Sequence, residues 1–168
     1  LVCLRNPHTV ATRVVPVEPM LKAMPRDLRR ALKEPQFVIG AQSTFIAGMK
    51  RILEASHIVD GGALLHGERG DWGFRFSHST VDASQDATDE ARAALDWVAG
   101  YCATNSEAIV LNPGDLLWVN NRRAIHGRGE VGSDVGGQER WLLRTYGIRP
   151  QLLEADQRYI ARPFQLFP

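Results

Sequence analysis

Short apolar runs that favour β-strands recur along most of the chain and limit the folds open to it. Gly, Pro, Asn and Asp close most of these runs, which is the spacing of an antiparallel sandwich or barrel. Parallel strand–helix–strand units are disfavoured by the same spacing. The predicted strands cover 1–6, 12–17, 36–40, 57–67, 72–77, 108–111, 116–121 and 140–148.

Two amphipathic helices are predicted between the strands. In residues 18–34, Leu21, Met24, Leu28 and Leu32 fall at steps of three and four, and the helix breaks or restarts at Pro25. In residues 86–102 the apolar stripe comprises Ala91, Ala94, Leu95, Val98 and Cys102, with Asp86 or Thr88 as the N-cap. Both helices are expected to pack on the outside of the sheets.

Charge and composition exclude several classes of partner. The chain of 168 residues has 20 basic and 19 acidic residues, a formal net charge of +1, and no long run of like charges. A nucleic-acid binder would need a basic stripe, so nucleic acid is not expected as a partner. No apolar stretch reaches the roughly 18 residues of a membrane span, and no membrane partner is expected.

The length fits a single domain spanning residues 1–168. Cys3 and Cys102 are too few for a disulfide framework, and neither has a second cysteine at metal-ligand spacing. A reduced, cytoplasmic setting is therefore predicted.

The stretch "NPGDLLWVNNRRAIHGR" contains the most informative histidine of the chain. The sequence predicts a tight turn at 113–115 and a buried strand over 116–119, after which the chain leaves the sheet and His126 projects from its rim. At such a position a histidine can be a metal ligand, a catalytic base or an ordinary turn residue.

An arginine follows His126 at a distance of fourteen residues. In "RWLLR", strand alternation places Arg140, Leu142 and Arg144 on one face, and Trp141 and Leu143 on the other. If the two strands are neighbours, a guanidinium lies beside the imidazole, where its planar fork matches a carboxylate. Arg140 could instead pair with Asp115 or Glu139 at the surface.

This combination resembles the C-terminal half of the iron(II)- and 2-oxoglutarate-dependent oxygenases, in the clavaminate synthase-like branch with its amino-acid hydroxylases. The resemblance rests on "PGDLLWVNNRRAIHGR" and "RWLLR", with "LVCLRNP" and "ATRVVPV" as an early barrel segment. It implies a double-stranded β-helix, or jelly roll, that is mainly β with helical insertions and incomplete at its N-terminus.

The resemblance also implies roles for individual residues. His126 matches the distal iron ligand, and Arg140 matches the arginine that binds the far carboxylate of 2-oxoglutarate. Thr12 matches a threonine that hydrogen-bonds the same carboxylate, and Arg144 would lie near cosubstrate or substrate. Fe(II) and 2-oxoglutarate are the implied cofactors.

The family's iron site also needs a His-x-Asp/Glu pair, which lies upstream of the segment resembling "LVCLRNP". The chain is therefore expected to be a C-terminal portion in which half of the iron site is absent, with Leu1 at an exposed edge near the pocket. His66 and Glu68 have the same spacing, but they adjoin a predicted hairpin turn at 69–71. These two side chains are expected to lie too far from His126 to share a metal.

Two functions remain open at this stage. One is an oxygenase that hydroxylates an unactivated C–H bond of an amino acid, free or carrier-bound. Relatives that act on arginine carry carboxylates in the segment resembling "FRFSHSTVDA". This chain has Ser77, His78 and Ser79 there, with Asp82 further along, which favours a neutral polar substrate. The other is a truncated, non-catalytic jelly roll that serves as a binding or interaction module.

Overall fold

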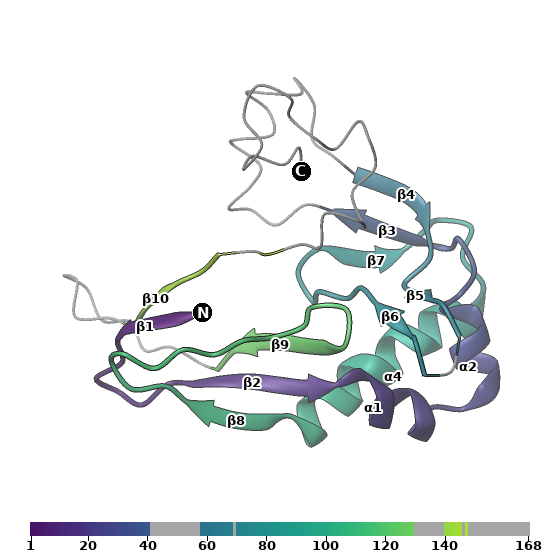
Figure 1. The fold of residues 1–168 in the computed structure, drawn as a ribbon. Coiled ribbons are helices and arrows are strands. Elements are labelled where there is room, and N and C mark those ends of the chain that lie inside the picture. The colour runs from purple at the N-terminus through teal and green to yellow at the C-terminus, as the bar shows by residue number, and fades with distance from the viewer. Residues whose placement is uncertain (41–57, 69, 130–139, 146, 148–168) are drawn as a thin grey trace.

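The computed structural model describes residues 1–40, 58–68, 70–129, 140–145 and 147. Within them, the chain forms four small antiparallel sheets, drawn in Figure 1. Their strand orders are β1-β10, β8-β2-β9, β4-β3-β7 and β5-β6. The strands are β1 Val2–Arg5, β2 Ala11–Pro16, β3 Phe37–Gly40, β4 Ile58–Gly62, β5 Leu65–His66, β6 Gly73–Phe74, β7 Val81–Ala83, β8 Glu107–Val110, β9 Ala124–Arg128 and β10 Trp141–Leu143.

All strand pairings in the described part of the chain are antiparallel, as the spacing of the apolar runs predicts. The prediction of a mainly β fold with helical insertions is confirmed. β2 is the central strand of its sheet, paired with β8 on one side and β9 on the other. It therefore brings together segments that lie more than a hundred residues apart in the sequence.

The first predicted helix is interrupted where the sequence indicates. α1 spans Val17–Ala23, α2 spans Arg26–Ala31, and Pro25 stands at the N-cap of α2. Proline suits the start of a helix, because its missing N–H would have no partner there. Leu21, Met24 and Leu32 are buried, and Leu28 packs against the same core.

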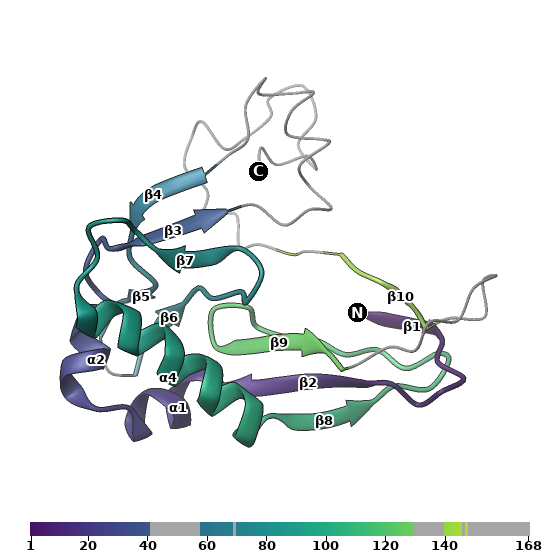
Figure 2. The same cartoon turned by 180° about the vertical axis from the view of Figure 1, so that it is seen from behind.

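The second predicted helix is α4, which spans Asp89–Asn105. Of the two predicted caps, Thr88 is the one used: its hydroxyl accepts a hydrogen bond from the Ala91 N–H at 3.2 Å. Ala91, Ala94 and Val98 are fully buried. In Figure 2 the helices lie together at one end of the molecule, beside the ends of the sheets.

The hydrophobic core lies between these helices and the sheets. α1 and α2 contribute Met20, Leu21 and Leu32, the sheets contribute Phe37, Ile39, Leu65 and Phe74, and α4 contributes Ala91, Ala94 and Val98. Trp72 completes the cluster, with the guanidinium of Arg29 at 5.7 Å from its ring. The core thus holds one end of β2 and the strand β6 in place against the helices.

The predicted strand over 116–121 is wrong. Leu116 makes only an isolated bridge to Val2, and the chain turns at 121–123 before β9 begins at Ala124. Leu116 and Trp118 are 66% and 80% exposed, so this segment is not a buried strand. An apolar run indicates side chains that favour burial, but it does not indicate whether another sheet or helix of the chain packs over them.

The other differences concern strand boundaries. The predicted strand over 57–67 is divided into β4 and β5, because the N–H groups of Leu64 and Leu65 both turn aside to the carbonyl of Leu32. β7 and β9 were not predicted. The turn before β6 is confirmed: Gly70 has a φ of 94°, and the Asp71 N–H donates to the Glu68 carbonyl at 2.9 Å.

The expected exposed edge at Leu1 is also wrong. The Leu1 amino group donates to the Leu117 carbonyl at 2.8 Å, and the Leu117 N–H donates to the Leu1 carbonyl at 2.8 Å. β10 lies along the other side of β1. The strand has neighbours on both sides.

The core predicts unequal effects of two truncations. Phe37→Ala should lower the free energy of unfolding by about 3–5 kcal/mol, because it leaves a cavity in the core. Leu116→Ala should lower it by less than about 0.5 kcal/mol, because that side chain is exposed. Urea denaturation followed by circular dichroism measures both, and equal losses would contradict this description of the core.

Candidate functional site

The sheet β8-β2-β9 positions the first part of the site. The β2–β9 register pairs Thr12 with Arg128 and Val14 with His126. Residues paired across an antiparallel sheet share a face, and residues two apart on one strand do so as well. Thr12, His126 and Arg128 therefore lie on one face of this sheet. His126 lies within β9 and not at a rim after the preceding strand.

Arg140 reaches the same face from the segment just before β10. Its Nη2 donates a hydrogen bond to Thr12 Oγ1 at 2.5 Å across 128 residues of sequence. Thr12 is only 2% exposed, which is unusual for a polar residue without a role in packing or binding. The alternative pairing of Arg140 with Asp115 is not formed, and Glu139 lies outside the described residues.

One polar atom of Arg140 has no partner. Its Nε is buried and makes no hydrogen bond with any described residue. Burial lowers the pKa of the Arg140 guanidinium, as does the nearby charge of Arg128. A buried donor without an acceptor is costly, so the atom is suited to an anionic ligand such as a carboxylate.

His126 is half-buried, and its pKa is lowered by desolvation and then by the positive charge of Arg144. The lowered pKa favours the neutral imidazole, whose free nitrogen can bind a metal ion. The same shift keeps the imidazole from adding to the positive charge of the surrounding arginines.

The four residues that the sequence singles out line one cavity of about 1760 Å³: Thr12, His126, Arg140 and Arg144. Small-molecule pockets commonly measure roughly 300–1,000 Å³, so this cavity has room for two ligands. The expectation that His126 and Arg140 lie on neighbouring strands is wrong, however: His126 lies on β9, and Arg140 lies just before β10. β9 and β10 belong to different sheets, and residues of both line the cavity.

The alternative metal pair is not supported by the geometry. Glu68 is 92% exposed at its side chain and lies 3.7 Å from Lys33 Nζ. His66 lines the cavity, yet no three His, Cys, Asp or Glu residues in the described ranges are placed to hold a metal ion together. Among the described residues, His66, Glu68 and His126 are thus not grouped around one point.

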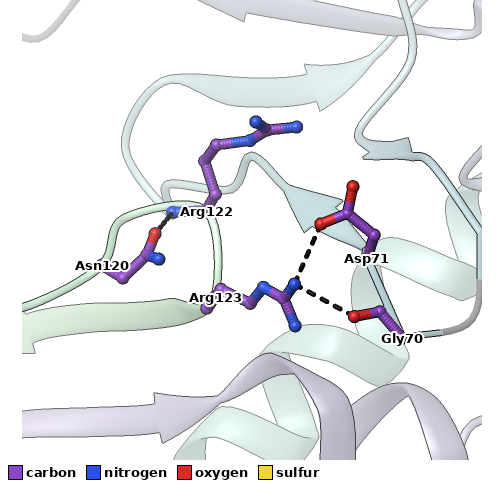
Figure 3. Close-up of polar contacts among 5 residues, drawn as sticks. All are labelled: Gly70, Asp71, Asn120, Arg122 and Arg123. Atoms are coloured by element: carbon purple, nitrogen blue, oxygen red, sulfur yellow. Dashed lines mark hydrogen bonds and ion pairs between the residues drawn. The ribbon is translucent and has the colours of Figure 1, made fainter. Parts of the chain in front are cut away.

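Sequence reasoning missed Arg122 and Arg123, which follow one another in the turn before β9. Figure 3 shows that their side chains diverge: the Arg123 guanidinium bonds Asp71 Oδ1 at 3.0 Å and the Gly70 carbonyl at 3.1 Å. Arg122 lines the cavity. Neither role has a signal in the sequence, because the strand-to-turn boundary at 120–124 was predicted in the wrong place.

Part of the chain matches the model of a known protein family. Residues 64–146 match the family described as taurine catabolism dioxygenase TauD, TfdA family. The enduracididine beta-hydroxylase of Streptomyces hygroscopicus is 26% identical over 86% of this chain and 46% of its own length. The L-asparagine oxygenase of Streptomyces coelicolor is 32% identical over 49% of this chain and 24% of its own length.

Among solved structures, the non-heme iron oxygenase OrfP in complex with Fe and alpha-ketoglutaric acid aligns with a TM-score of 0.63 and 28% identity. The alignment covers 83% of this chain and 41% of that one. The chain thus spans less than half the length of these relatives. Within the described residues, no helix is long and apolar enough to cross a membrane.

The Thr12–Arg140 contact gives a prediction for stability. Thr12→Val keeps the shape of the side chain but leaves Arg140 Nη2 without an acceptor, and it should lower the free energy of unfolding by about 1.5–3 kcal/mol. Thr12→Ser keeps the hydroxyl and should cost less than the valine variant. Urea denaturation of both variants measures the difference, and equal losses would mean that packing and not the hydrogen bond is responsible.

Proposed function

Because the chain carries a TauD/TfdA-family domain over residues 64–146, we propose that the whole protein is an iron(II)- and 2-oxoglutarate-dependent hydroxylase. Its substrate in this proposal is an amino acid or an amino-acid derivative, free or carrier-bound. Relatives named as amino-acid hydroxylases and oxygenases support this class. Residues 1–168 are proposed to act as one domain, and the two free cysteines support a cytoplasmic setting.

The observation that carries the proposal is the unpaired Nε of Arg140 beside the hydroxyl of Thr12. A guanidinium binds a carboxylate through two parallel N–H groups, and here one of its N–H groups is buried without an acceptor. The far carboxylate of 2-oxoglutarate would satisfy it. In this role Arg140 binds the cosubstrate, and Thr12 holds the guanidinium in place.

Iron needs more ligands than the described residues supply. His126 provides one neutral imidazole, and no group of three metal-binding side chains exists in these ranges. We propose His126 as one ligand of an iron site that the described residues do not complete. When bound, iron(II) with 2-oxoglutarate and dioxygen supplies the oxidation that hydroxylates a C–H bond.

The remaining residues of the site would bind and orient the ligands. Arg144 lines the same cavity as His126, is near enough to lower its pKa, and is proposed to bind cosubstrate or substrate. The protein's part is thus positioning and charge, while the cofactor carries out the oxidation.

A non-catalytic binding module is the second candidate. The cavity and the buried Nε of Arg140 would support it as well as they support an oxygenase. In that case the cavity and Arg140 would still bind a carboxylate, but no iron would be held. Metal binding therefore distinguishes the two candidates.

Titration with Fe(II) under argon, in the presence of 2-oxoglutarate, tests the proposal on the whole protein. We expect one ion per chain, and 2-oxoglutarate consumption when oxygen is admitted. His126→Ala should weaken iron binding by roughly 100-fold or more, since it removes a direct ligand. Glu68→Ala is the matched control and should bind iron normally, because its carboxylate lies at the surface.

Two results would contradict this assignment. Loss of iron binding in Glu68→Ala would show that the other carboxylate is the ligand. Binding of 2-oxoglutarate without any binding of iron by the unaltered protein would identify a binding module in place of an oxygenase.

A further inference from the structure

The described wall of the cavity carries an excess of positive charge. Six arginines line it, and no aspartate or glutamate does so among the residues that the structure describes. Arg13 alternates with Thr12 on β2, so its side chain leaves from the opposite face of that strand. The other five are Arg75, Arg122, Arg128, Arg140 and Arg144.

Two of these positive charges have a use in the proposed function. Arg140 takes the far carboxylate of 2-oxoglutarate, and one more cation can serve the α-carboxylate that every free amino acid carries. Beyond these uses, and beyond Arg144, which is proposed to bind cosubstrate or substrate, the cavity wall carries Arg75, Arg122 and Arg128. A cationic side chain would be repelled by these like charges.

The backbone of Arg122 is held on both sides of its Cα. Its N–H donates to Asn120 Oδ1 at 3.0 Å, and its carbonyl accepts from the Phe74 N–H at 3.0 Å. The side chain lies across Gly73: a Cβ built on this glycine would be 3.0 Å from both Nε and Nη2 of Arg122. A Cβ at position 73 would require the guanidinium to move by a few tenths of an ångström.

The Arg122 guanidinium also differs from its neighbour in having no acidic partner. Arg123 is engaged by Asp71, whereas the described residues give the Arg122 guanidinium neither an ion pair nor a hydrogen bond. Figure 3 shows it directed away from that pair. Ser77 and Ser79, whose hydroxyls are 3.3 Å apart, line the same cavity and add neutral donors.

We propose that the substrate of this site is an amino acid with an acidic side chain, and that Arg122 binds its side-chain carboxylate. The proposal deepens the proposed function and rests on it. It replaces the neutral polar substrate favoured by the sequence, because the sequence did not show that Arg122 reaches the cavity. The planar fork of arginine matches a carboxylate, and an amide offers only one acceptor atom in its place.

The test uses two isosteric pairs, L-aspartate with L-asparagine and L-glutamate with L-glutamine, and L-arginine as the cationic case. Each is supplied to the iron- and 2-oxoglutarate-loaded protein, and succinate formation gives kcat/KM. Calorimetric binding without oxygen gives a second readout. We expect the acidic member of at least one pair to exceed its amide by about 10- to 100-fold in kcat/KM, the range for a charged hydrogen-bonded contact.

Three variants assign the effect to Arg122. Arg122→Gln should remove most of this preference and leave the amide nearly unaffected. Gly73→Ala should lower the preference much less than Arg122→Gln does, because its Cβ shifts the guanidinium by only a few tenths of an ångström. Arg30→Gln removes an equal charge from the exposed face of α2 and should keep the preference.

The possible outcomes distinguish failure of the acidic-substrate proposal from failure of the proposed hydroxylase function. If iron and 2-oxoglutarate bind but neither acidic amino acid is preferred to its amide, the acidic substrate is wrong and the hydroxylase stands. If Arg122→Gln weakens all substrates equally, Arg122 holds the α-carboxylate and the side-chain assignment is overturned. If neither iron nor 2-oxoglutarate binds, both proposals fail.

Discussion

The hydrogen bond from Arg140 to Thr12 is the contact on which the described site depends. It joins the central strand of the β8-β2-β9 sheet to the segment that leads into β10, although the two residues are 128 positions apart. Because β9 pairs with the same central strand, the contact also sets Arg140 beside the face that carries His126 and Arg128. The residues proposed to bind the cosubstrate and the metal are therefore held together through β2.

The charges of the cavity follow from this arrangement. Arg128 and Arg140 lie close enough for the first to lower the pKa of the second, and Arg144 does the same to His126. Like charges held together at partial burial are unfavourable unless an anion joins them. The positive charges that line the cavity therefore favour anionic ligands.

Local patterns predicted the helices and the turns well. Pro25, Thr88 and Gly70 act through their own backbone or side chain, and each does in the structure what the sequence indicates. The shared cavity of His126 and Arg140 was also predicted, but through a resemblance and not through local rules.

Two predictions were wrong: the buried strand over 116–121 and the neighbouring strands for His126 and Arg140. Burial of an apolar run and pairing of distant strands depend on tertiary contacts, which no local pattern contains. Arg122 was missed for the same reason, since its place beside the cavity depends on the contact of its carbonyl with the distant Phe74 N–H.

An anaerobic crystal structure of the whole protein with Fe(II) and 2-oxoglutarate tests the central claim most directly. The account predicts an imidazole nitrogen of His126 at about 2.0–2.2 Å from the metal, as expected for a bond from imidazole to a first-row metal. It also predicts that the far carboxylate of the cosubstrate accepts from Arg140 Nε at about 2.7–2.9 Å. A metal bound away from His126, or a cosubstrate that leaves Arg140 Nε without an acceptor, would contradict it.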